Sequence, residues 1–530
     1  MSGLTNLIGR RALLDYARRP LNIVLLVVVP IVIVFVWAGA LADFSKVILG
    51  GKGERSQIEV ATAGWAAAAL AGLTGFFQVA GSRPADRRLA AASGRTAPVV
   101  AGRLCAAVGL AVLAAAGGLA ALALRTGFSN PIRVVAATVA VAVIYLALGV
   151  LVGISVRNEM NGALLITLIW VFDVFLGPAL GPDSSLLTRF LPLHFPSLVL
   201  IGQTSGHSGP IGDVGWSIAW AIGLAALATA RTAFATRPKS PPSRAGGTAM
   251  TARTPLLVAA IPATSPPTPT RTTPLRGTTR WIAVLQAGMR EYRRNRVLWA
   301  LLVVVPAVFI GMAIMITVDM PGPIALVEGD RHFVELISQR RMHAATMVPI
   351  TSAFLAGIAG LFVVTESSGG DRRLVLAGLR TREVLAGRVG VIGAATVLTT
   401  AVAIAVSGSW YAPSQWLVFA SANLLIALTY AMIGVLVGPI TGRIGGLYLI
   451  LMLAFIDVGL GQSVMLADGP PAWGTYLPAR GASQMMIDGA FTANFDRLGA
   501  LLLAVAWLAA FSAAATVVFH HRSRRMPLPS

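Results

Sequence analysis

The sequence predicts an all-α polytopic membrane protein made of two parallel six-helix bundles, with twelve transmembrane helices in total. Composition is the first reason: of 530 residues, 56% are hydrophobic and 12% are charged, and the mean hydropathy is +0.76. A soluble domain is about 25% charged. The second reason is an internal repeat, because apolar stretches and short motifs of the first half recur in the same order in the second.

Twelve apolar stretches are long enough for helices that cross a bilayer. Such a helix needs about 20 residues, and lipid offers no partner to an unpaired backbone amide. The first apolar run is longer than the core of a signal peptide and has a counterpart inside the chain, so we interpret it as a retained span. We expect spans at residues 21–42, 58–80, 98–124, 133–155, 161–180 and 214–236, and at 297–318, 344–365, 384–406, 414–438, 445–463 and 495–520.

A charged segment follows the second span of each half. It reads "ADRRLAAASGRTAPVVAGRL" at residues 85–104, the first island, and "GDRRLVLAGLRTREVLAGRV" at residues 370–389, the second island. Between residues 86 and 103, eleven of eighteen positions are identical to the position 285 residues later. Six spans per half is an even number, so both halves enter and leave on the same side and the repeat is parallel.

The repeat divides the chain into three parts. Residues 1–236 form the first transmembrane half and residues 279–530 the second, and each begins with an amphipathic helix expected to lie in the headgroup plane as an elbow. Residues 237–278 are rich in Pro, Ser and Thr, which predicts a disordered cytoplasmic linker. Apolar stretches broken by Pro and Gly at 181–204 and 464–492 predict re-entrant hairpins in the outer leaflet.

The net charge of +21 is distributed as the positive-inside rule expects. Most of the 42 Lys and Arg residues fall on the side that holds both termini, so we place both termini in the cytoplasm. Nucleic acid is not an expected partner, because the arginines lie near helix ends and no aromatic-rich soluble module accompanies them. Cys105 is the single cysteine, which excludes an intramolecular disulfide.

Each island combines an acid, two arginines and a short apolar helical segment. One interpretation is a coupling helix that docks on a cytoplasmic partner; the other is that the arginines only fix the topology. Retention of Leu89 as Leu374, with Thr96 as Thr381, favours a shaped docking surface. The expected coupling residues are Asp86, Arg87, Arg88, Leu89 and Arg95, and Glu366, Asp371, Arg372, Arg373, Leu374, Arg380, Arg382 and Glu383.

The order of elements resembles a known family. An amphipathic helix, two spans, a loop of the form D-R-R-L-x-x-A-x-x-R-T-x-x-V-x-A-G-R, four more spans and a broken turn ending in "LP" resemble the permease subunits of type-2 ABC exporters. The tandem arrangement resembles bacterial antibiotic and multidrug efflux permeases. The resemblance covers nearly the whole chain apart from the linker. It implies export of hydrophobic small molecules across the bacterial cytoplasmic membrane, with one nucleotide-binding subunit docked under each half.

The chain lacks a phosphate-binding loop of the form G-x-x-x-x-G-K-[ST]. Its nearest text, "GGKGERS" at residues 50–56, has no hydroxyl residue after the Lys. We therefore expect no enzymatic activity and no cofactor on this chain. ATP and Mg²⁺ are expected on two copies of a separate ATPase subunit.

Two acids fall at matching positions inside apolar segments, Asp173 in "FDVFLG" and Asp457 in "IDVGLG". A carboxylate within a membrane costs about 2.5 to 3.5 kcal/mol, so each must face protein or water. The pair would either attract cationic cargo or cap the re-entrant turns by accepting backbone amides freed at Gly177 and Pro178 or at Gly459 and Gly461. Aromatic and Met side chains suit apolar ligands but also serve as ordinary helix or lipid contacts. The expected pathway residues, besides the two acids, are Trp170, Phe172, Phe175, Met452 and Phe455.

The segment from Glu328 to His343 contains two His among acids and arginines. Their irregular spacing argues against a metal site, so we expect a solvated loop or a short helix. A proton-coupled secondary transporter of the major facilitator type is the alternative function, because it also has six plus six spans. Its loop would read G-x-x-x-D-R-x-G-R-R, whereas "DRRLVLAGLRT" inserts an apolar turn. A membrane enzyme would need a catalytic cluster, and an ABC importer an E-A-A-x-x-x-G loop; the sequence offers neither.

Overall fold

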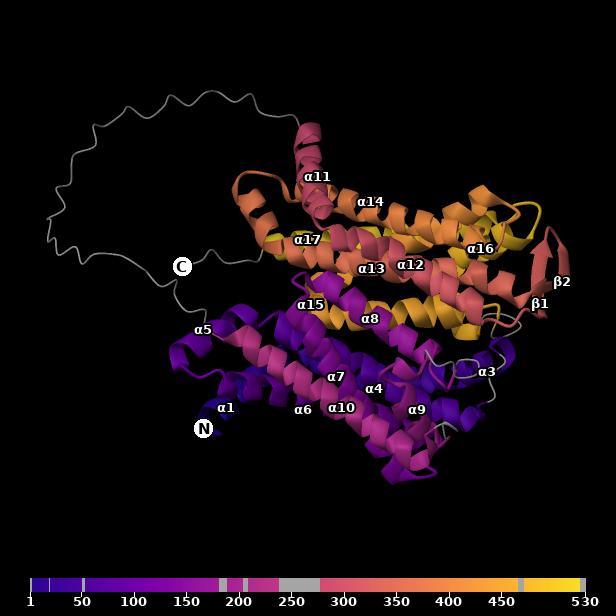
Figure 1. Cartoon of the computed structure of the whole chain (residues 1–530). Coiled ribbons are helices and arrows are strands. Elements are labelled where there is room, and N and C mark those ends of the chain that lie inside the picture. Colours follow the sequence, from indigo (N-terminus) through magenta and orange to yellow (C-terminus); the bar gives the residue numbers. More distant parts are fainter. Residues whose placement is uncertain are drawn as a thin grey trace, which may run out of the picture.

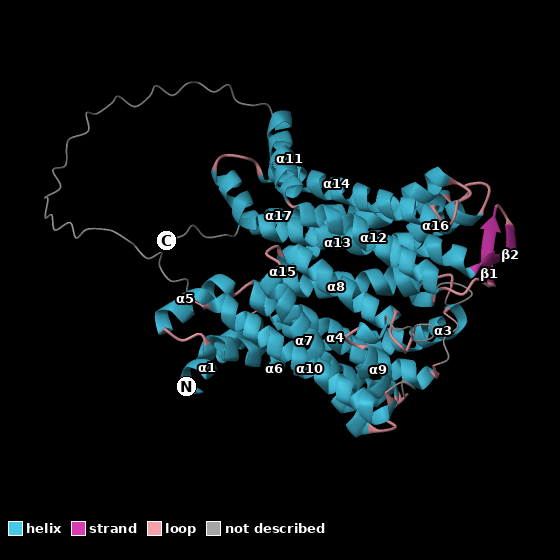
Figure 2. Cartoon of the chain, viewed as in Figure 1, coloured by secondary structure: helices cyan, strands magenta, loops and turns pink. Residues whose placement is uncertain are grey.

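The computed structural model describes residues 2–18, 20–49, 53–180, 188–203, 208–237, 277–465 and 471–524. Most of the linker, residues 238–276, lies outside this described part, and so does the prediction of disorder there. The regular elements of the described part are helices, apart from one β-hairpin (Figure 2). This confirms the prediction of an all-α polytopic membrane protein at the level of its overall class.

The first half contains ten α-helices with one π-helical segment, η1, and one 3-10 turn, η2, among its described residues. In chain order these are α1 (Ser2–Ala17), α2 (Pro20–Val32), η1 (Ile33–Trp37), α3 (Ala38–Ile48), α4 (Arg55–Ala80), α5 (Arg83–Ser93), α6 (Ala97–Arg125), α7 (Pro131–Ser155), α8 (Glu159–Phe175), η2 (Thr188–Phe190), α9 (His194–Ile201) and α10 (Gly209–Thr236).

The second half follows the same order, with a β-hairpin added and with two longer helices that each replace a pair of helices of the first half. Its described elements are α11 (Gly277–Arg294), α12 (Arg296–Ile316), β1 (Pro321–Glu328), β2 (Arg331–Ser338), α13 (Gln339–Leu376), α14 (Thr381–Gly408), α15 (Trp416–Ala454), η3 (Phe455–Gly461, π-helical), η4 (Ala472–Tyr476, 3-10), α16 (Arg480–Phe491) and α17 (Leu498–Arg524).

Polar side chains mark where several long helices begin. Asn130, Asn158, Asn295 and Ser338 each accept a hydrogen bond from a backbone amide three residues later, at the N-termini of α7, α8, α12 and α13. Such N-caps satisfy amides that have no partner inside the helix. The sequence therefore encodes the ends of these apolar helices through a few polar residues.

The two halves form two bundles that pack side by side (Figure 1). The core helix of each bundle is the second long one, α4 or α13, and 94% of the residues in its most apolar stretch are buried. Helix α4 packs on α7 at Gly72 and Gly149, where an added Cβ on Gly149 would collide with the carbonyl of Gly72. Helices α13 and α15 meet in the same way at Gly357 and Gly434. The repeat seen in sequence is thus a repeat of close helix packing.

The bundles exchange contacts in a crossed pattern. Helix α8 of the first half lies against α12 and α13 of the second, while α15 of the second half lies against α2 and α4 of the first. Both islands lie at one end of the molecule, which we call the island end (left in Figure 1). The β-hairpin lies at the opposite end, which we call the hairpin end.

Ten helical segments among the described residues are long and apolar enough to cross a membrane. The count differs from twelve for two reasons. Helix α8 has only 17 residues, and residues 416–461 form one 46-residue helical segment where the sequence suggested two spans. That segment contains a break at Gly442, whose φ of 74° and ψ of −172° are not helical. A multi-pass membrane protein is therefore confirmed, and the number twelve stays a prediction.

The expectation of a solvated loop or short helix between Glu328 and His343 was wrong. Strands β1 and β2 pair antiparallel, from Pro321 opposite Ser338 to Glu328 opposite Arg331, and Gly329 in the turn has a positive φ of 58°. Alternate residues of β1 are buried, with Ile324 packed in a cluster with Met342. This period-two pattern is typical of a strand with one covered face.

The regions predicted as re-entrant hairpins are only partly described, because residues 181–187, 204–207 and 466–470 lie outside the described part. The rest of each region holds a 3-10 turn followed by a short helix, η2 and α9 in the first half and η4 and α16 in the second. Whether these segments re-enter the membrane stays a prediction.

Candidate functional site

The two islands fold differently. The first forms a separate helix, α5, which begins after Gly81 and Ser82 and has Pro84 in its first turn. The second does not form a separate helix as predicted, because α13 continues through it to Leu376. Proline has no amide hydrogen and clashes with the preceding turn, so Pro84 interrupts the helix. Its counterpart in the second half, Gly369, has an amide and lets the helix continue.

A hydrogen-bonded triad holds the first island in place. Asp86 accepts a hydrogen bond of 2.6 Å from Ser82 Oγ and one of 2.9 Å from Arg103 Nε. Asp86 is buried, so its charge is used inside the protein. Arg103 lies on α6, and the triad therefore joins the start of α5 to the following long helix.

The same triad occurs 285 residues later in the second island. Asp371 accepts hydrogen bonds from Ser367 Oγ at 2.7 Å and from Arg388 at 2.9 Å and 2.8 Å. We call each triad an island clamp. The serines were missed in the sequence, and the closing arginines were noted only as part of the motif. The signal that identifies them is retention of Ser, Asp and Arg at one spacing in both islands.

Besides Asp86 and Asp371, a third predicted coupling acid, Glu383, is buried. Its carboxylate accepts the amide of Arg380 at 2.9 Å and so caps α14. In the first island, Arg87 donates from Nε to the carbonyl of Ala235 at the end of α10, at 3.0 Å. Most of the other predicted coupling residues are exposed: Arg87, Arg88, Leu89, Arg95, Glu366, Arg373, Arg380 and Arg382. Arg372 and Leu374 are partly buried.

Arg83 attaches the first island to a second place in the bundle. Its guanidinium donates to the carbonyl of Val156, beyond the end of α7, at 3.0 Å. Burial lowers the pKa of Arg83 below its usual range, and the nearby charges of Arg87 and Arg157 add to this effect. The first island is thus held by α6, α7 and α10 together.

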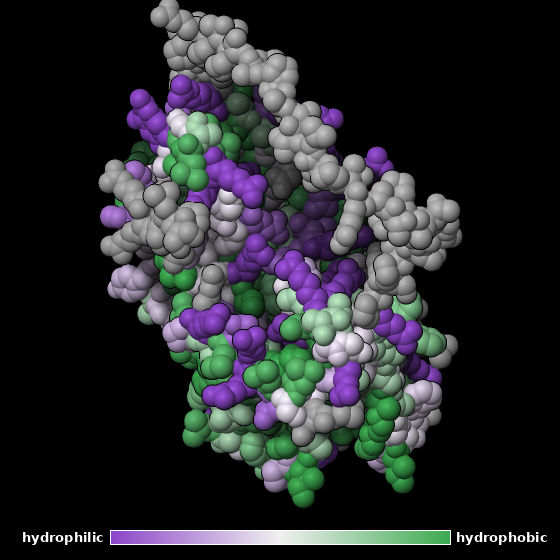
Figure 3. Space-filling view, turned by 90° about the vertical axis from the view of Figure 1, so that its left-hand side faces the viewer, coloured by the Kyte–Doolittle hydropathy of each residue, from purple (hydrophilic) through white to green (hydrophobic). Residues whose placement is uncertain are grey.

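A cavity of about 840 Å³ opens between the halves at the island end. Hydrophilic side chains gather around a hollow on this face (Figure 3). Its size is within the range of sites for drug-sized ligands, about 300 to 1,000 Å³. Side chains from both halves line it, among them Tyr16, Phe77, Gln78, Glu159, Thr365 and Arg443.

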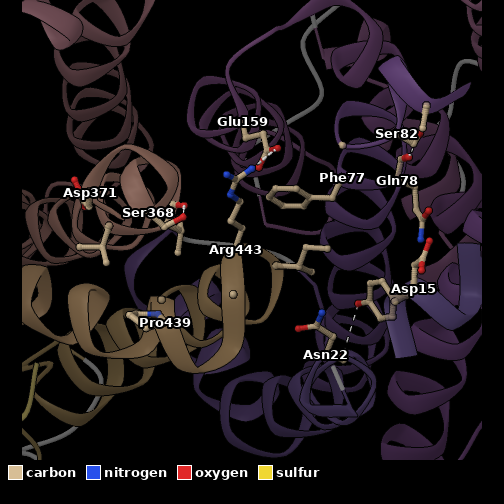
Figure 4. A pocket seen from close by; sticks show the side chains of 18 of the residues that line it. Asp15, Asn22, Phe77, Gln78, Ser82, Glu159, Ser368, Asp371, Pro439 and Arg443 are labelled. Carbon is tan, nitrogen blue, oxygen red and sulfur yellow. Dashed lines mark hydrogen bonds and ion pairs between the residues drawn. The ribbon is translucent and has the colours of Figure 1, made fainter. Parts of the chain in front are cut away.

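Polar contacts join the halves at the edge of this cavity and elsewhere in their interface. Arg443 Nη1 lies 2.6 Å from Glu159 Oε1 (Figure 4). Thr74 and Tyr448 share a hydrogen bond of 3.0 Å between their hydroxyl groups, and Asn161 Nδ2 donates to Asn295 Oδ1 at 2.9 Å. The interface is therefore specified by particular polar pairs in addition to its apolar packing.

Asp173 is 1% exposed and ties three segments together. It accepts the hydroxyl of Tyr145 on α7 at 2.5 Å and the amide of Leu193 at 3.3 Å. Leu193 is the N-cap residue of α9. The carboxylate thus joins α8, α7 and the start of the short helix after the "LP" turn.

Asp457 makes the equivalent contacts in the second half. Tyr430 donates its hydroxyl at 2.9 Å, the amide of Ala479 donates at 2.9 Å, and Gln462 donates at 3.3 Å. Neither aspartate is among the described residues that line the cavity. This geometry favours the capping alternative, although the amides come from the residue after "LP" and not from the glycines of the turn. A role in binding cargo stays a prediction.

A smaller apolar pocket of about 90 Å³ lies between the halves nearer the hairpin end. It brings together Phe175 and Phe455, two of the predicted pathway residues, and Trp37, whose ring lies 5.2 Å from that of Phe455. Trp37 and Phe455 belong to the π-helical segments η1 and η3, which meet here. Such segments are frequent at functional sites.

The remaining predicted pathway residues lie elsewhere. Trp170 donates its indole hydrogen to the carbonyl of Trp65 at 2.9 Å within the first half. Phe172 and Met452 are partly buried and pack against the main apolar core. For these three, the structure shows ordinary helix contacts.

The histidines of the hairpin region do not converge. His332 lies on β2, whereas His343 is buried in α13 with its Nδ1 2.6 Å from Thr317 Oγ1. Within the described ranges, no group of three or more His, Cys, Asp and Glu side chains is arranged to hold a metal ion.

Comparison with known proteins adds no relative. No family model matches this chain, and no curated protein matches its sequence. The resemblance to type-2 ABC permeases therefore stays a prediction, and a functional assignment depends on the site geometry.

Proposed function

We propose that this chain is the permease subunit of an ATP-driven ABC exporter that moves hydrophobic or amphipathic small molecules out of a bacterial cell. One observation carries the proposal. Two equivalent islands, each fixed by the same Ser–Asp–Arg clamp, flank one cavity between the halves. Two docking elements beside a central cavity suit an alternating-access transporter, in which a partner on one face moves the two halves as rigid bodies.

The clamps explain how force would pass from a partner to the membrane. Arg103 lies on α6 and Arg388 on α14, so a push on either island acts directly on the next long helix. The exposed arginines of the islands would meet acidic grooves on two copies of a separate ATPase subunit. ATP and Mg²⁺ would bind to that subunit.

The proposed topology has twelve spans. Counting α8 as the fifth span and dividing α15 at Gly442 gives six spans per half. The islands and both termini then lie in the cytoplasm, where the positive-inside rule places arginine-rich loops. The island-end cavity opens to the cytoplasm in this arrangement.

The cargo is proposed to be mainly apolar. None of the described side chains lining the pocket around Trp37 and Phe455 is Asp, Glu, Lys or Arg. The larger cavity places Phe77 beside polar groups, which suits an amphipathic molecule.

Reconstitution tests the proposal directly. The chain is co-expressed with the stand-alone ATPase encoded nearest to it, purified and placed in liposomes. We expect one chain to co-purify with two ATPase subunits, and ATP hydrolysis to rise when cargo is added. An ATPase subunit with its phosphate-binding lysine replaced should assemble but not transport. Full transport by the chain alone, driven by a proton gradient, would instead support the secondary-transporter alternative.

A further inference from the structure

Glu159 and Arg443 occupy one equivalent position of the internal repeat. Each lies fourteen residues before a buried aspartate, Asp173 or Asp457. Glu159 is the first residue of α8, and Arg443 directly follows the break at Gly442 in α15. One repeat position therefore carries opposite charges in the two halves.

These two residues also touch each other. Their charged atoms are 2.6 Å apart, and the side chains are 37% exposed for Arg443 and 18% for Glu159. Figure 4 shows Arg443 reaching from α15 toward Glu159 at the edge of the cavity. When equivalent residues of two related units contact each other, they lie at the axis that relates the units. The ion pair therefore marks the pseudo-two-fold axis of the molecule.

Because these residues lie on the axis, the signs of their charges determine which halves can pair. A half paired with a copy of itself would bring two glutamates or two arginines together at this point. Like charges in contact are strongly unfavourable, and partial burial reduces the screening that water and salt provide. Opposite charges at this position favour only the pairing of a first half with a second half.

Neighbouring contacts differ between the halves in the same way. Asn161 bonds to Asn295, whereas the residue equivalent to Asn161 is Gly445. A Cβ on Gly445 would lie 2.8 Å from Oδ1 of the Asn22 side chain. The two surfaces are thus complementary to each other and not each to itself.

Three other charged residues that line the cavity, Asp15, Arg103 and Asp371, form ion pairs within their own half. Asp15 lies 3.1 Å from Arg18, Asp371 pairs with Arg388, and Arg103 pairs with Asp86. The pair formed by Glu159 and Arg443 differs from these because it crosses the interface. We infer that Glu159 and Arg443 form a selective interaction surface that pairs each half with the other half of the chain and excludes a second copy of itself.

Charge reversal in the full-length chain tests this inference without any ATPase. Cys105→Ser removes the single native cysteine, and Gln78→Cys with Ser368→Cys places spin labels on opposite sides of the cavity (Figure 4). Double electron–electron resonance then measures the distance between the two labels, which reports the separation of the halves. Glu159→Arg or Arg443→Glu should shift the distances to longer values, because each creates a like-charge pair. The exchange variant, Glu159→Arg with Arg443→Glu, should restore the original distances.

The neutral variant, Glu159→Gln with Arg443→Gln, is the matched control and should shift the distances less than either single reversal. If the single reversals fail to fold, the exchange variant decides the test. Recovery of a folded, monodisperse protein with the original distances supports the inference. Failure of the exchange variant as well, or unchanged distances in the single reversals, overturns it.

Pairing between chains tests selectivity itself. Two differently tagged chains, one with Glu159→Arg and one with Arg443→Glu, carry complementary charges only when their halves are exchanged between chains. They should co-purify when expressed together, whereas two tagged copies of the unmodified chain should not. Absence of co-purification in the mixed pair would contradict the selective role.

Discussion

Arg388 donates two hydrogen bonds to one carboxylate oxygen of Asp371, from Nε at 2.9 Å and from Nη2 at 2.8 Å. The side chains are 11% and 7% exposed. In the first half, Arg103 donates to Asp86 from Nε at 2.9 Å, with side chains 15% and 11% exposed. The second island clamp is therefore the more buried of the two.

Removing the acid of the second clamp should destabilise the protein. Asp371→Ala leaves Arg388 buried without its partner, which typically costs about 3 kcal/mol. We expect a lower midpoint of thermal unfolding in detergent, and a smaller decrease for Asp86→Ala. Arg373→Ala, which alters an exposed side chain of the same island, is the control and should leave the midpoint nearly unchanged. Equal losses for all three variants would contradict the clamp.

The intramembrane aspartates should matter for stability more than for selection of cargo. Asp173→Ala removes the acceptor for Tyr145 and Leu193, and an unpaired buried polar group costs about 1 to 3 kcal/mol. Asp173→Asn keeps an acceptor oxygen and should be milder, and the same order is expected for Asp457→Ala and Asp457→Asn. Thermal unfolding measures this order.

Transport assays separate the two roles of these aspartates. If they serve as caps, the double variant Asp173→Asn with Asp457→Asn keeps the ratio of cationic to neutral cargo exported. A selective loss of cationic cargo, with normal expression and thermal stability, would restore the cargo-binding interpretation.

The islands should differ in their contribution to coupling. The second island carries the exposed Arg382 where the first has Ala97, so it presents more basic surface to a partner. We expect Arg372→Glu with Arg373→Glu to reduce cargo-stimulated ATP hydrolysis more than Arg87→Glu with Arg88→Glu. The assay uses the reconstituted complex, with expression and thermal midpoint as controls. Equal effects would refute the asymmetry.

Gly442 holds a backbone conformation that other residues rarely adopt. With φ at 74° and ψ at −172°, a side chain there is strained, which costs about 1 to 3 kcal/mol. Gly442→Ala should lower the thermal midpoint and displace the adjacent Arg443. Gly369→Ala is the matched control, because that glycine is helical and has no atom within 4 Å of an added Cβ. A midpoint unchanged by Gly442→Ala would show that the break can relax.

Much of the fold follows from local sequence signals. Three features are visible without coordinates: the apolar stretches, the charged islands and the equivalence of Asp173 and Asp457 in the repeat. Each depends on residues close together in sequence or on the repeat itself. The β-hairpin was missed because only β1 has alternate residues buried, whereas the charged residues of β2 indicated a solvated segment. The break at Gly442 was predicted as a gap between spans, yet the helix resumes directly after it.

The candidate site was predicted less completely. Tyr145 and Tyr430 stand out in the sequence as repeated residues, but their bonds to the aspartates span 28 and 27 positions between helices. Arg103 and Arg388 lie 17 positions from their partners. Such contacts depend on how neighbouring helices pack, and periodicity within one helix carries no information about them.

The sequence by itself determined that this is a membrane protein, that it is helical and that it contains two repeats. These properties depend on composition and on the order of residues along the chain. Only the tertiary structure decided which repeated residues work as pairs. It turned three predicted coupling acids inward, and it placed Glu159 against Arg443 although 284 positions separate them. The physical reason is that a bilayer selects apolar helices one at a time, whereas polar pairs form only after the helices have packed.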